Sequence, residues 1–392
     1  MRPLDGITVL DLTRVLSGPY CTMLLADMGA RVIKIEQPGQ GDDTRAWGPP
    51  FLEGESAYFL SINRNKESVT LDFKRPDGRV IVDRLIAKSD VLVENFRPGT
   101  LDKLGLDYRS LAARHPRLIY CSVSGFGHTG PRRNEPGYDA VIQAEGGLMS
   151  ITGAADGPPF RLGVAIADIV SGMFAAYGVA MALFARERTG RGQDVDVAML
   201  DAVTALLTYQ AGNYFASGNV PARLGNRHPS IVPYETFAAS DGDFVLAVGT
   251  DEQWRRFCAV AGIEDVERFA TNRQRVTEYD AFRPIVAARL RTQPRQVWID
   301  RLTAAGIPCG SVRNLQEAFD DLQLVAREMI AKVSHATIGP LQVLGVPVKL
   351  SDTPGAARTA PPLLGQHTDA VLRRDLGLDA DAIARLRHQR VI

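Results

Sequence analysis

The stretch PPFRLGVAIADIVSGMFAAYGVAMALFARERTGRGQDVDVAM, residues 158–199, sets the character of the chain. It begins with a turn, continues as a long run of Ala, Val, Ile, Leu, Met and Phe, and ends at a Gly-rich basic segment. Such a run predicts a helix that is too apolar to lie on a surface. The run contains one charged side chain, Asp168, and a buried carboxylate without a partner is strongly unfavourable. We therefore expect Asp168 to be paired, to cap a helix, to be protonated or to face a solvated cleft.

The composition limits the classes of partner. The chain has 392 residues, 45% of them hydrophobic, which is enough for roughly two to three domains with large cores. Its 45 Lys and Arg balance 45 Asp and Glu, so no net charge attracts nucleic acid or an anionic membrane. Asp168 also interrupts the longest apolar run, which disfavours a membrane span. We expect neither a nucleic-acid partner nor a membrane partner.

The cysteines indicate a reducing compartment. The four of them are far apart, and neither a CxxC pair nor a histidine spacing suggests zinc. The N-terminus enters a strand pattern directly, without the features of a signal peptide. We therefore expect reduced thiols, no metal and a cytoplasmic protein. The cysteines are Cys21, Cys121, Cys258 and Cys309.

The first part of the chain alternates strands and helices. Residues 7–12 read as a buried strand, 17–28 as a helix and 31–35 as a second strand. This βαβ unit predicts an α/β fold with a parallel sheet. Glu36 follows the second strand as the ribose-binding acid of dinucleotide folds does, but the preceding turn lacks GxGxxG. We therefore do not expect an NAD or FAD site.

Polar segments follow several of the predicted strands. The loop at 39–51 carries Arg45 and Trp47, a cation and a flat apolar surface that suit a carboxylate and an acyl chain. The alternative is that Trp47 merely pins the loop to the body. Residues 95–97 and 125–130 follow strands predicted at 91–95 and 118–127, where α/β sheets bind ligands. Asp139 begins a helix and is most simply its N-terminal cap.

Taken together, these segments resemble the family III CoA-transferases, which include formyl-CoA transferase, carnitine CoA-transferase and α-methylacyl-CoA racemase. The resemblance covers both ends of the chain and nearly all of its middle. It rests on PLDGITVLDLTRVLSGP, GARVIKIE, SINRNK, VLVENFRPG, GYD, Asp168 in its apolar run, TGRGQDVDVAM and PLLGQHT.

The resemblance implies a fold of two domains. A Rossmann-like large domain, with a parallel sheet, would take 1–195 and 335–392. Linkers would span 196–224 and 315–334, and a smaller α+β domain would take 225–314. Members of this family form interlaced, ring-like dimers, so we expect a homodimer of that kind.

The resemblance also implies the chemistry. Asp168 would be the nucleophile that attacks an acyl-CoA thioester, giving an aspartyl mixed anhydride and then an aspartyl-CoA thioester. Such a reaction requires neither a metal nor a redox cofactor, and CoA thioesters are substrates. Both intermediates hydrolyse readily, so the apolar surroundings of Asp168 suit the exclusion of water.

The site residues are carried over from the family motifs. Formyl-CoA transferase has an arginine after the second strand, whereas this chain has Gln37. The contact of that arginine with the CoA diphosphate is then either lost or supplied by a neighbouring cation. The expected CoA contacts are Leu16, Ser17, Leu71, Asp72, Phe73, Lys74, Asn95, Phe96, Arg97, Lys103, Gly137, Tyr138 and Asp139. The expected substrate contacts are Arg45, Trp47, Tyr58 and His228.

Two loops point to a class of substrate and leave alternatives. GDDTRAWGPPF and GNRHPSIVPYETF most resemble members that use succinyl-CoA and glutarate, and Arg45 would then clamp the distal carboxylate of a diacid. A 2-methylacyl-CoA racemase is one alternative, but racemases carry histidine where this chain has Tyr138, a poor base at neutral pH. A non-catalytic acyl-CoA-binding protein is the other alternative.

Overall fold

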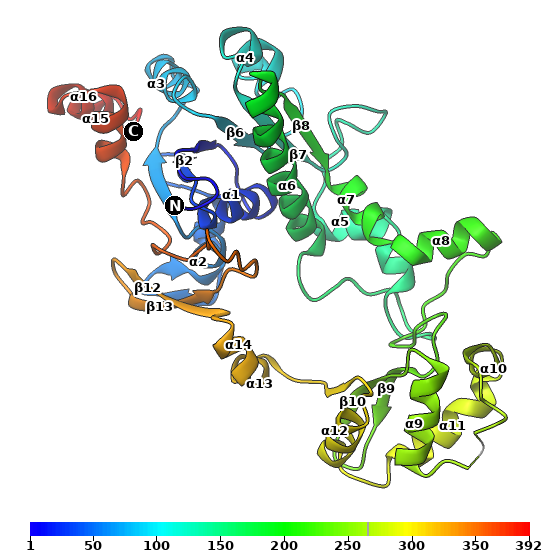
Figure 1. Ribbon diagram of the computed structural model, residues 1–392. Coiled ribbons are helices and arrows are strands. Elements are labelled where there is room, and N and C mark those ends of the chain that lie inside the picture. The colour runs from blue at the N-terminus through cyan, green and yellow to red at the C-terminus, as the bar shows by residue number, and fades with distance from the viewer. Residues whose placement is uncertain (265) are drawn as a thin grey trace. The chain divides into compact units, whose positions relative to one another are not determined.

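The computed structural model describes residues 1–264 and 266–392, which form two compact units (Figure 1). Unit 1 consists of Met1–Leu148, Arg161–Gly212 and Leu322–Ile392. Unit 2 consists of Met149–Phe160 and Asn213–Asp321. The chain therefore leaves unit 1 and returns to it, and both termini belong to unit 1.

Unit 1 is built on a six-stranded parallel sheet in the order β5-β2-β1-β6-β7-β8. This confirms the α/β class with a parallel sheet. The sequence predicts a strand at 68–73, but the strand found there, β5, is displaced toward the N-terminus, because it pairs with β2 from Val32↔Lys66 to Glu36↔Thr70. The strands are β1 Thr8–Asp11, β2 Arg31–Glu36, β5 Lys66–Thr70, β6 Val91–Glu94, β7 Ile119–Ser124 and β8 Asp194–Ala198.

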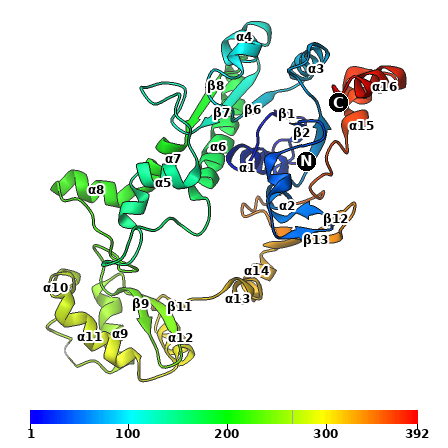
Figure 2. The ribbon, with the colours of Figure 1, turned by 180° about the vertical axis from the view of Figure 1, so that it is seen from behind.

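Helices cover both faces of this sheet (Figure 2). Each face has its own buried apolar cluster, as expected for a parallel sheet. On one face lie α1 Ser17–Asp27, α5 Asp139–Glu145, α6 Ile166–Thr189 and α7 Met199–Leu206. On the other lie α3 Pro76–Ile86, α4 Tyr108–Arg114, α15 Thr368–Leu376 and α16 Ala380–His388. The last two helices belong to the C-terminal segment, which lies in unit 1.

The helix α6 differs from its expected environment. It packs against α1, β7 and β8 and buries residues such as Ala175 and Val179. The opposite side is exposed in the single chain, with Tyr177 at 63% and Phe184 at 57%. The expectation of a helix buried all round is therefore wrong for one chain by itself. By length and composition α6 would also be able to cross a membrane, although 44% of its most apolar window is buried in this fold.

Unit 2 has its own sheet and core. Its three strands are antiparallel, in the order β11-β10-β9, with bounds Cys309–Ser311, Asp243–Ala247 and Tyr234–Ala238. Four helices pack Trp254, Trp298 and several phenylalanines against this sheet. These helices are α9 Asp251–Ala261, α10 Asn272–Thr277, α11 Tyr279–Leu290 and α12 Arg295–Ala304.

The unit boundaries differ from the expected domain limits. Residues 149–160 belong to unit 2, because the amide of Gly225 donates to the carbonyl of Gly153 at 3.0 Å and Arg223 donates to that of Gly157 at 2.8 Å. The expected linker 196–224 consists largely of α7 and α8, Thr208–Ser217. The remaining elements are η1 Asp43–Ala46, β3 Phe51–Leu52, β4 Glu55–Ser56, α2 Ala57–Ile62, η2 Asp102–Leu104, η3 Leu148–Ile151, α13 Leu315–Phe319, α14 Leu322–Ala326, β12 Ile330–His335 and β13 Gly339–Leu344.

Candidate active site

Asp168 lies in the first turn of α6 and lines a cavity of about 180 Å³. The cavity also contains Ser17, the first residue of α1, and Tyr138, the N-cap residue of α5. The beginnings of three helices therefore meet at one carboxylate. A helix N-terminus favours negative charge, so this arrangement suits an anion that reacts there. The apolar run explains the helix, and Asp168 occupies the turn where a carboxylate is best tolerated.

The surroundings change the acidity of Asp168. Burial raises its pKa to about 7, and the negative charge of Asp139 acts in the same direction. Hydrogen bonds from the side chain and backbone of Ser17 act against this shift. At neutral pH a large share of Asp168 is therefore ionised, and it is a more basic carboxylate than an ordinary aspartate.

Asp139 holds the segment that leads to Asp168. Its Oδ1 accepts a hydrogen bond from the amide of Ala167 at 2.9 Å, and its Oδ2 accepts one from Gln143 Nε2 at 2.8 Å. Gln143 Oε1 accepts the amide of Leu162 at 3.0 Å. The expected cap role is wrong, because Tyr138 is the N-cap residue of α5, and the Asp139 carboxylate accepts from the Ala167 amide of α6 and from the Gln143 side chain.

A second cavity, of about 420 Å³, adjoins the first, and the two share Arg14, Asp43 and Phe96. Together they bring most of the expected CoA contacts to the C-terminal ends of β1, β2 and β6. The first cavity is lined by Ser17, Asn95, Phe96, Arg97, Gly137 and Tyr138, and the second by Leu71, Asp72, Phe73, Lys74, Phe96 and Gln37.

Three expected CoA contacts line neither cavity. Leu16 is buried in an apolar cluster, Lys103 is exposed in η2, and Asp139 bonds α6. Among the lining residues, the Asn95 amide is already used. Its Oδ1 accepts the amide of Arg14 at 2.8 Å and its Nδ2 donates to the Arg14 carbonyl at 2.7 Å. Asn95 therefore shapes the wall of the cavity through Arg14.

One expected substrate residue, Tyr58, interacts with Asp168, and a second, Trp47, contacts Tyr58. Burial raises the pKa of Tyr58 to about 12, and the negative charge of Asp168 contributes to this shift. Tyr58 packs in the apolar cluster that includes Ala165 and Ile169, which flank the nucleophile candidate. The Trp47 ring meets the Tyr58 ring edge-on, with centroids 5.2 Å apart. Trp47 and Tyr58 thus form an aromatic pair, of which neither member lines the cavity that contains Asp168.

Arg45 is used differently from the prediction. Its Nε and Nη2 donate to Glu36 Oε2 and Oε1 at 2.7 and 2.8 Å, and Nη2 also donates to the Pro362 carbonyl. The guanidinium lies 3.6 Å over the Phe59 ring. This arrangement argues against a substrate-carboxylate clamp, because the fork of donors already holds Glu36. Glu36 is likewise occupied, as expected for a fold that lacks the dinucleotide motif.

His228 belongs to unit 2, where its ring is part of a local structure. Its Nδ1 accepts the amides of Ser230 and Ile231 at 3.0 and 3.1 Å, and its ring stacks on Tyr234 with centroids 5.4 Å apart. These contacts fit the alternative of a packed linker histidine. A contact between His228 and the substrate stays a prediction.

Sequence reasoning missed several residues around the site. Arg14 and Asp43 line both cavities, and Gln143 supports Asp139. Asp42, which is 2% exposed, accepts the amide of Val15 at 3.2 Å. The signal for Asp42 and Asp43 was present, since two adjacent acids follow a Gly-rich segment in the loop that the sequence identified. Their long-range partners gave no local signal.

Nearly the whole chain matches one family of known proteins. The model described as CoA-transferase family III matches residues 4–368. The chain belongs to CoA-transferase family III. It is therefore an enzyme of the CoA-transferase class.

This CoA-transferase is similar to curated relatives and to the solved structure of another protein over almost the whole length of each. It is 42% identical to the succinyl-CoA:glutarate CoA-transferase of Mus musculus, covering 98% of this chain and 89% of the mouse protein. It is 43% identical to the acetyl-CoA:oxalate CoA-transferase of Acetobacter aceti, covering 95% of each. The crystal structure of a CAIB/BAIF family protein from Brucella suis has a TM-score of 0.85 and 43% identity, covering 95% of this chain and 99% of the other.

Proposed function

We propose that this enzyme transfers CoA from succinyl-CoA, or another dicarboxyl-CoA, to a dicarboxylate such as glutarate, with Asp168 as the nucleophile. The observation that supports this most is the place of Asp168. It is a partly buried carboxylate at the start of α6, with a pKa raised to about 7, in a cavity that adjoins a second, larger one. The larger cavity suits the nucleotide part of CoA and the smaller one the thioester.

The proposed reaction proceeds through two kinds of covalent intermediate. The Asp168 carboxylate attacks the thioester carbonyl and the C–S bond breaks. CoA departs as the thiolate, and an aspartyl mixed anhydride remains on the enzyme. The thiolate then attacks the Asp168 carbonyl carbon, which releases the donor acid as a carboxylate and forms an aspartyl-CoA thioester. The acceptor carboxylate repeats both steps in reverse order. Asp168 returns as a carboxylate, and the steps consume no net proton.

Three features of the site support this series of reaction steps. The pKa of Asp168 near 7 leaves enough carboxylate at neutral pH while making it more basic, which aids attack. Ser17, in the first turn of α1, supplies hydrogen-bond donors beside the reacting oxygen atoms. The apolar cluster with Tyr58, Ala165 and Ile169 limits access of water to the anhydride.

The choice of acids rests on less general features. Relatives of nearly equal identity are named for succinyl-CoA with glutarate and for acetyl-CoA with oxalate, so overall identity does not select the pair. The loop with Trp47 resembles members that use glutarate, and Trp47 contacts Tyr58, whose pKa is affected by Asp168. Since Arg45 holds Glu36, the distal carboxylate of the acid needs another cation or water.

An incubation of the enzyme with succinyl-CoA and glutarate tests the substrate proposal, with glutaryl-CoA measured by mass spectrometry. The acceptor panel should include oxalate, acetate and a longer monocarboxylate, so that a preference for diacids is visible. We expect glutaryl-CoA to form faster than the monocarboxyl-CoA products. Faster formation of the monocarboxyl-CoA products would contradict the dicarboxylate proposal while leaving transferase activity intact.

Chemical trapping tests the role of Asp168 separately. Hydroxylamine added during turnover should convert Asp168 to a hydroxamate, which peptide mass spectrometry locates. Asp168→Asn, which has nearly the same shape, should abolish exchange and trapping while still binding acyl-CoA. CoA exchange by this variant at the wild-type rate would exclude the nucleophile role. Binding of acyl-CoA by the wild type without any exchange would favour the non-catalytic alternative.

The racemase alternative has less support at this site. Racemisation needs a base on each face of the α-carbon, and Tyr138 stands in the Asp168 cavity where racemases carry histidine.

We also propose that the enzyme is an interlaced homodimer. The exposed apolar side of α6, with Met173, Tyr177 and Phe184, would be covered by the second copy. The cytoplasmic location stays a prediction.

A further inference from the structure

A strained backbone turn precedes α1 and lies next to Asp168. Val15 has a φ of 69°, in the left-handed region that β-branched residues rarely adopt. It stands two residues before Ser17, which hydrogen-bonds Asp168, and its side chain packs in the cluster that includes Ala165 and Ile169. Strain of this kind persists where the surrounding structure imposes it, commonly at functional sites.

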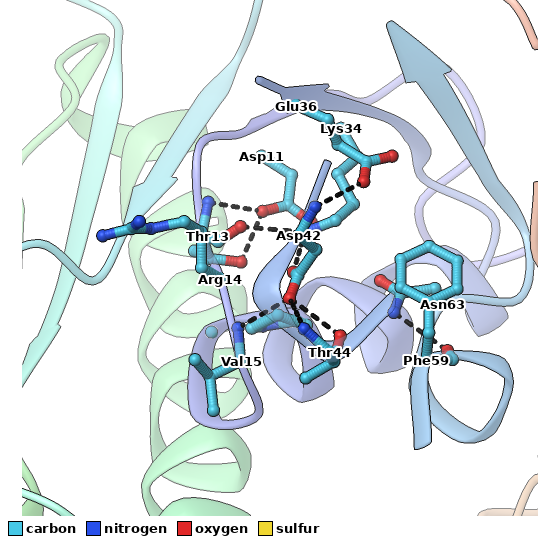
Figure 3. Close-up of polar contacts among 12 residues, drawn as sticks. Asp11, Thr13, Arg14, Val15, Lys34, Glu36, Asp42, Thr44, Phe59 and Asn63 are labelled. Carbon is cyan, nitrogen blue, oxygen red and sulfur yellow. Dashed lines mark hydrogen bonds and ion pairs between the residues drawn. The ribbon is translucent and has the colours of Figure 1, made fainter. Parts of the chain in front are cut away.

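Asp42 is the side chain that holds this residue (Figure 3). Its Oδ1 accepts the amide of Val15 at 3.2 Å and also the amide and hydroxyl of Thr44 at 3.0 and 2.7 Å. Its Oδ2 lies 2.9 Å from Lys34 Nζ, and both side chains of this ion pair are fully buried. The contacts with Thr44 and Lys34 therefore fix the carboxylate that accepts the Val15 amide.

The neighbouring residues of the turn are held from other directions. Lys34 Nζ donates to the Thr13 carbonyl at 2.8 Å, and Asp11 accepts the Thr13 amide at 2.8 Å. Asn95 brackets the backbone of Arg14 with two hydrogen bonds. Three consecutive residues before α1 are thus tied to β1, β2, the loop before η1 and the end of β6. The fixed segment ends two residues before Ser17, the donor beside Asp168.

We propose that Asp42 is a positioning residue for CoA transfer, holding Val15 in its left-handed conformation so that Ser17 is aligned with Asp168. This inference rests on the proposed role of Asp168. Without the acceptor at position 42, Val15 relaxes toward an ordinary conformation and Ser17 shifts, while the walls of the larger cavity remain. The chemical step should then suffer more than the binding of acyl-CoA.

The test must avoid a buried unpaired charge. Asp42→Ala alone would leave Lys34 without its partner, which destabilises proteins strongly. We therefore compare Lys34→Met/Asp42→Asn with Lys34→Met/Asp42→Leu. Asparagine and leucine have the same number of heavy side-chain atoms and branch at the same carbon, but only the asparagine keeps an acceptor for the Val15 amide. We expect kcat of the leucine variant to be on the order of 10- to 100-fold lower than that of the asparagine variant. KM for acyl-CoA should be similar in both, while the melting temperature of the leucine variant should be somewhat lower, because leucine also removes the acceptor for the amide and hydroxyl of Thr44.

A second substitution and a second measurement separate positioning from general damage. Val15→Gly added to the leucine variant should restore part of kcat, because glycine adopts the left-handed conformation without strain. Hydrogen exchange of a peptide covering residues 13–23 should be faster in the leucine variant than in the asparagine variant. Equal kcat in the two variants, or equal exchange of this peptide, would overturn the inference.

The same experiment distinguishes this inference from the proposed function. If the wild type exchanges no CoA, the proposed function fails, while hydrogen exchange still decides whether Asp42 holds the turn. If the wild type is active and the two double variants behave alike, Asp42 has no positioning role and the proposed function stands.

Discussion

Asp139 raises the pKa of Asp168 by its negative charge and, through the amide of Ala167 at 2.9 Å, also fixes the beginning of the helix that carries it. One side chain thus couples the geometry of the candidate nucleophile to its acidity. In a transferase that needs a carboxylate at neutral pH, both properties affect the rate. The relationship leads directly to a test by pH.

We expect kcat/KM for acyl-CoA to rise with pH through about 7, because Asp168 has a pKa of about 7 and attacks as the carboxylate. Asp139→Asn removes the neighbouring charge and keeps an acceptor for the Ala167 amide. The pKa of Asp168 then falls, so the midpoint of the profile should move to lower pH, by on the order of one unit. A pH–rate profile of both proteins is the measurement. An unmoved midpoint would show that the charge of Asp139 does not act on the reacting group.

Asp168→Asn should stabilise the folded protein at high pH. The pKa of Asp168 is higher in the folded protein than the ordinary value of 3.8, so its contribution to stability is complete below that value and is lost as pH rises through about 7. Asparagine does not ionise, so the variant does not lose stability in this way as the pH rises. We expect the variant to gain on the order of 1 kcal/mol over the wild type at pH 8.5 relative to pH 5. Denaturant unfolding at both pH values checks this, and the same difference at both would refute it.

Arg45→Ala should destabilise the protein and leave the preference for diacids unchanged. The substitution leaves the buried Glu36 carboxylate without its two guanidinium hydrogen bonds. Loss of one partner of a buried pair lowers the free energy of unfolding by about 3 kcal/mol or more. Arg45→Lys, which keeps the charge without the planar fork, should be intermediate. An altered ratio of glutarate to acetate use at unchanged stability would restore the carboxylate-clamp role.

Glu94→Gln should be nearly neutral at pH 7 and stabilising at pH 9. Burial raises the pKa of Glu94 to about 8, so the group is largely protonated at pH 7 and its contribution is lost as pH rises through about 8. Its Oε2 accepts the amide of Phe96 at 2.7 Å, a hydrogen bond that glutamine can keep. Thermal melts at both pH values test this. Glu187→Gln, on an exposed side chain, is the control and should show no such pH dependence.

Tyr177→Glu should dissociate the proposed homodimer. The side of α6 that carries Tyr177 is exposed in the single chain and apolar, and a buried charge in an interface is unfavourable. Light scattering should give about twice the chain mass of 42.7 kDa for the wild type and for the control Tyr177→Phe. The glutamate variant should give the mass of one chain. A monomeric wild type would remove the dimer proposal.

Much of the fold follows from local patterns. The helix predicted at 17–28 is α1. Residues 251–261 likewise read as a helix and form α9, which begins with a Thr250 capping box and has Gly262 as its C-cap. Where such capping signals are absent, the tertiary structure sets the boundaries of the elements. β5 begins at Lys66, two residues before the expected start, because its register is set by β2. Residues 149–160 join unit 2 through hydrogen bonds to a segment far along the chain.

The sequence by itself determined the class of fold, the family and the prominence of one carboxylate in an apolar run, because these depend on local periodicity and ordered motifs. The tertiary structure alone decided how the charged loop is used. It pairs Arg45 with Glu36, turns Asp139 toward α6 and sets Asp42 against Val15. The physical reason is that a buried charge takes the partner that packing brings to it, and such partners lie on segments whose local sequence contains no trace of the pairing.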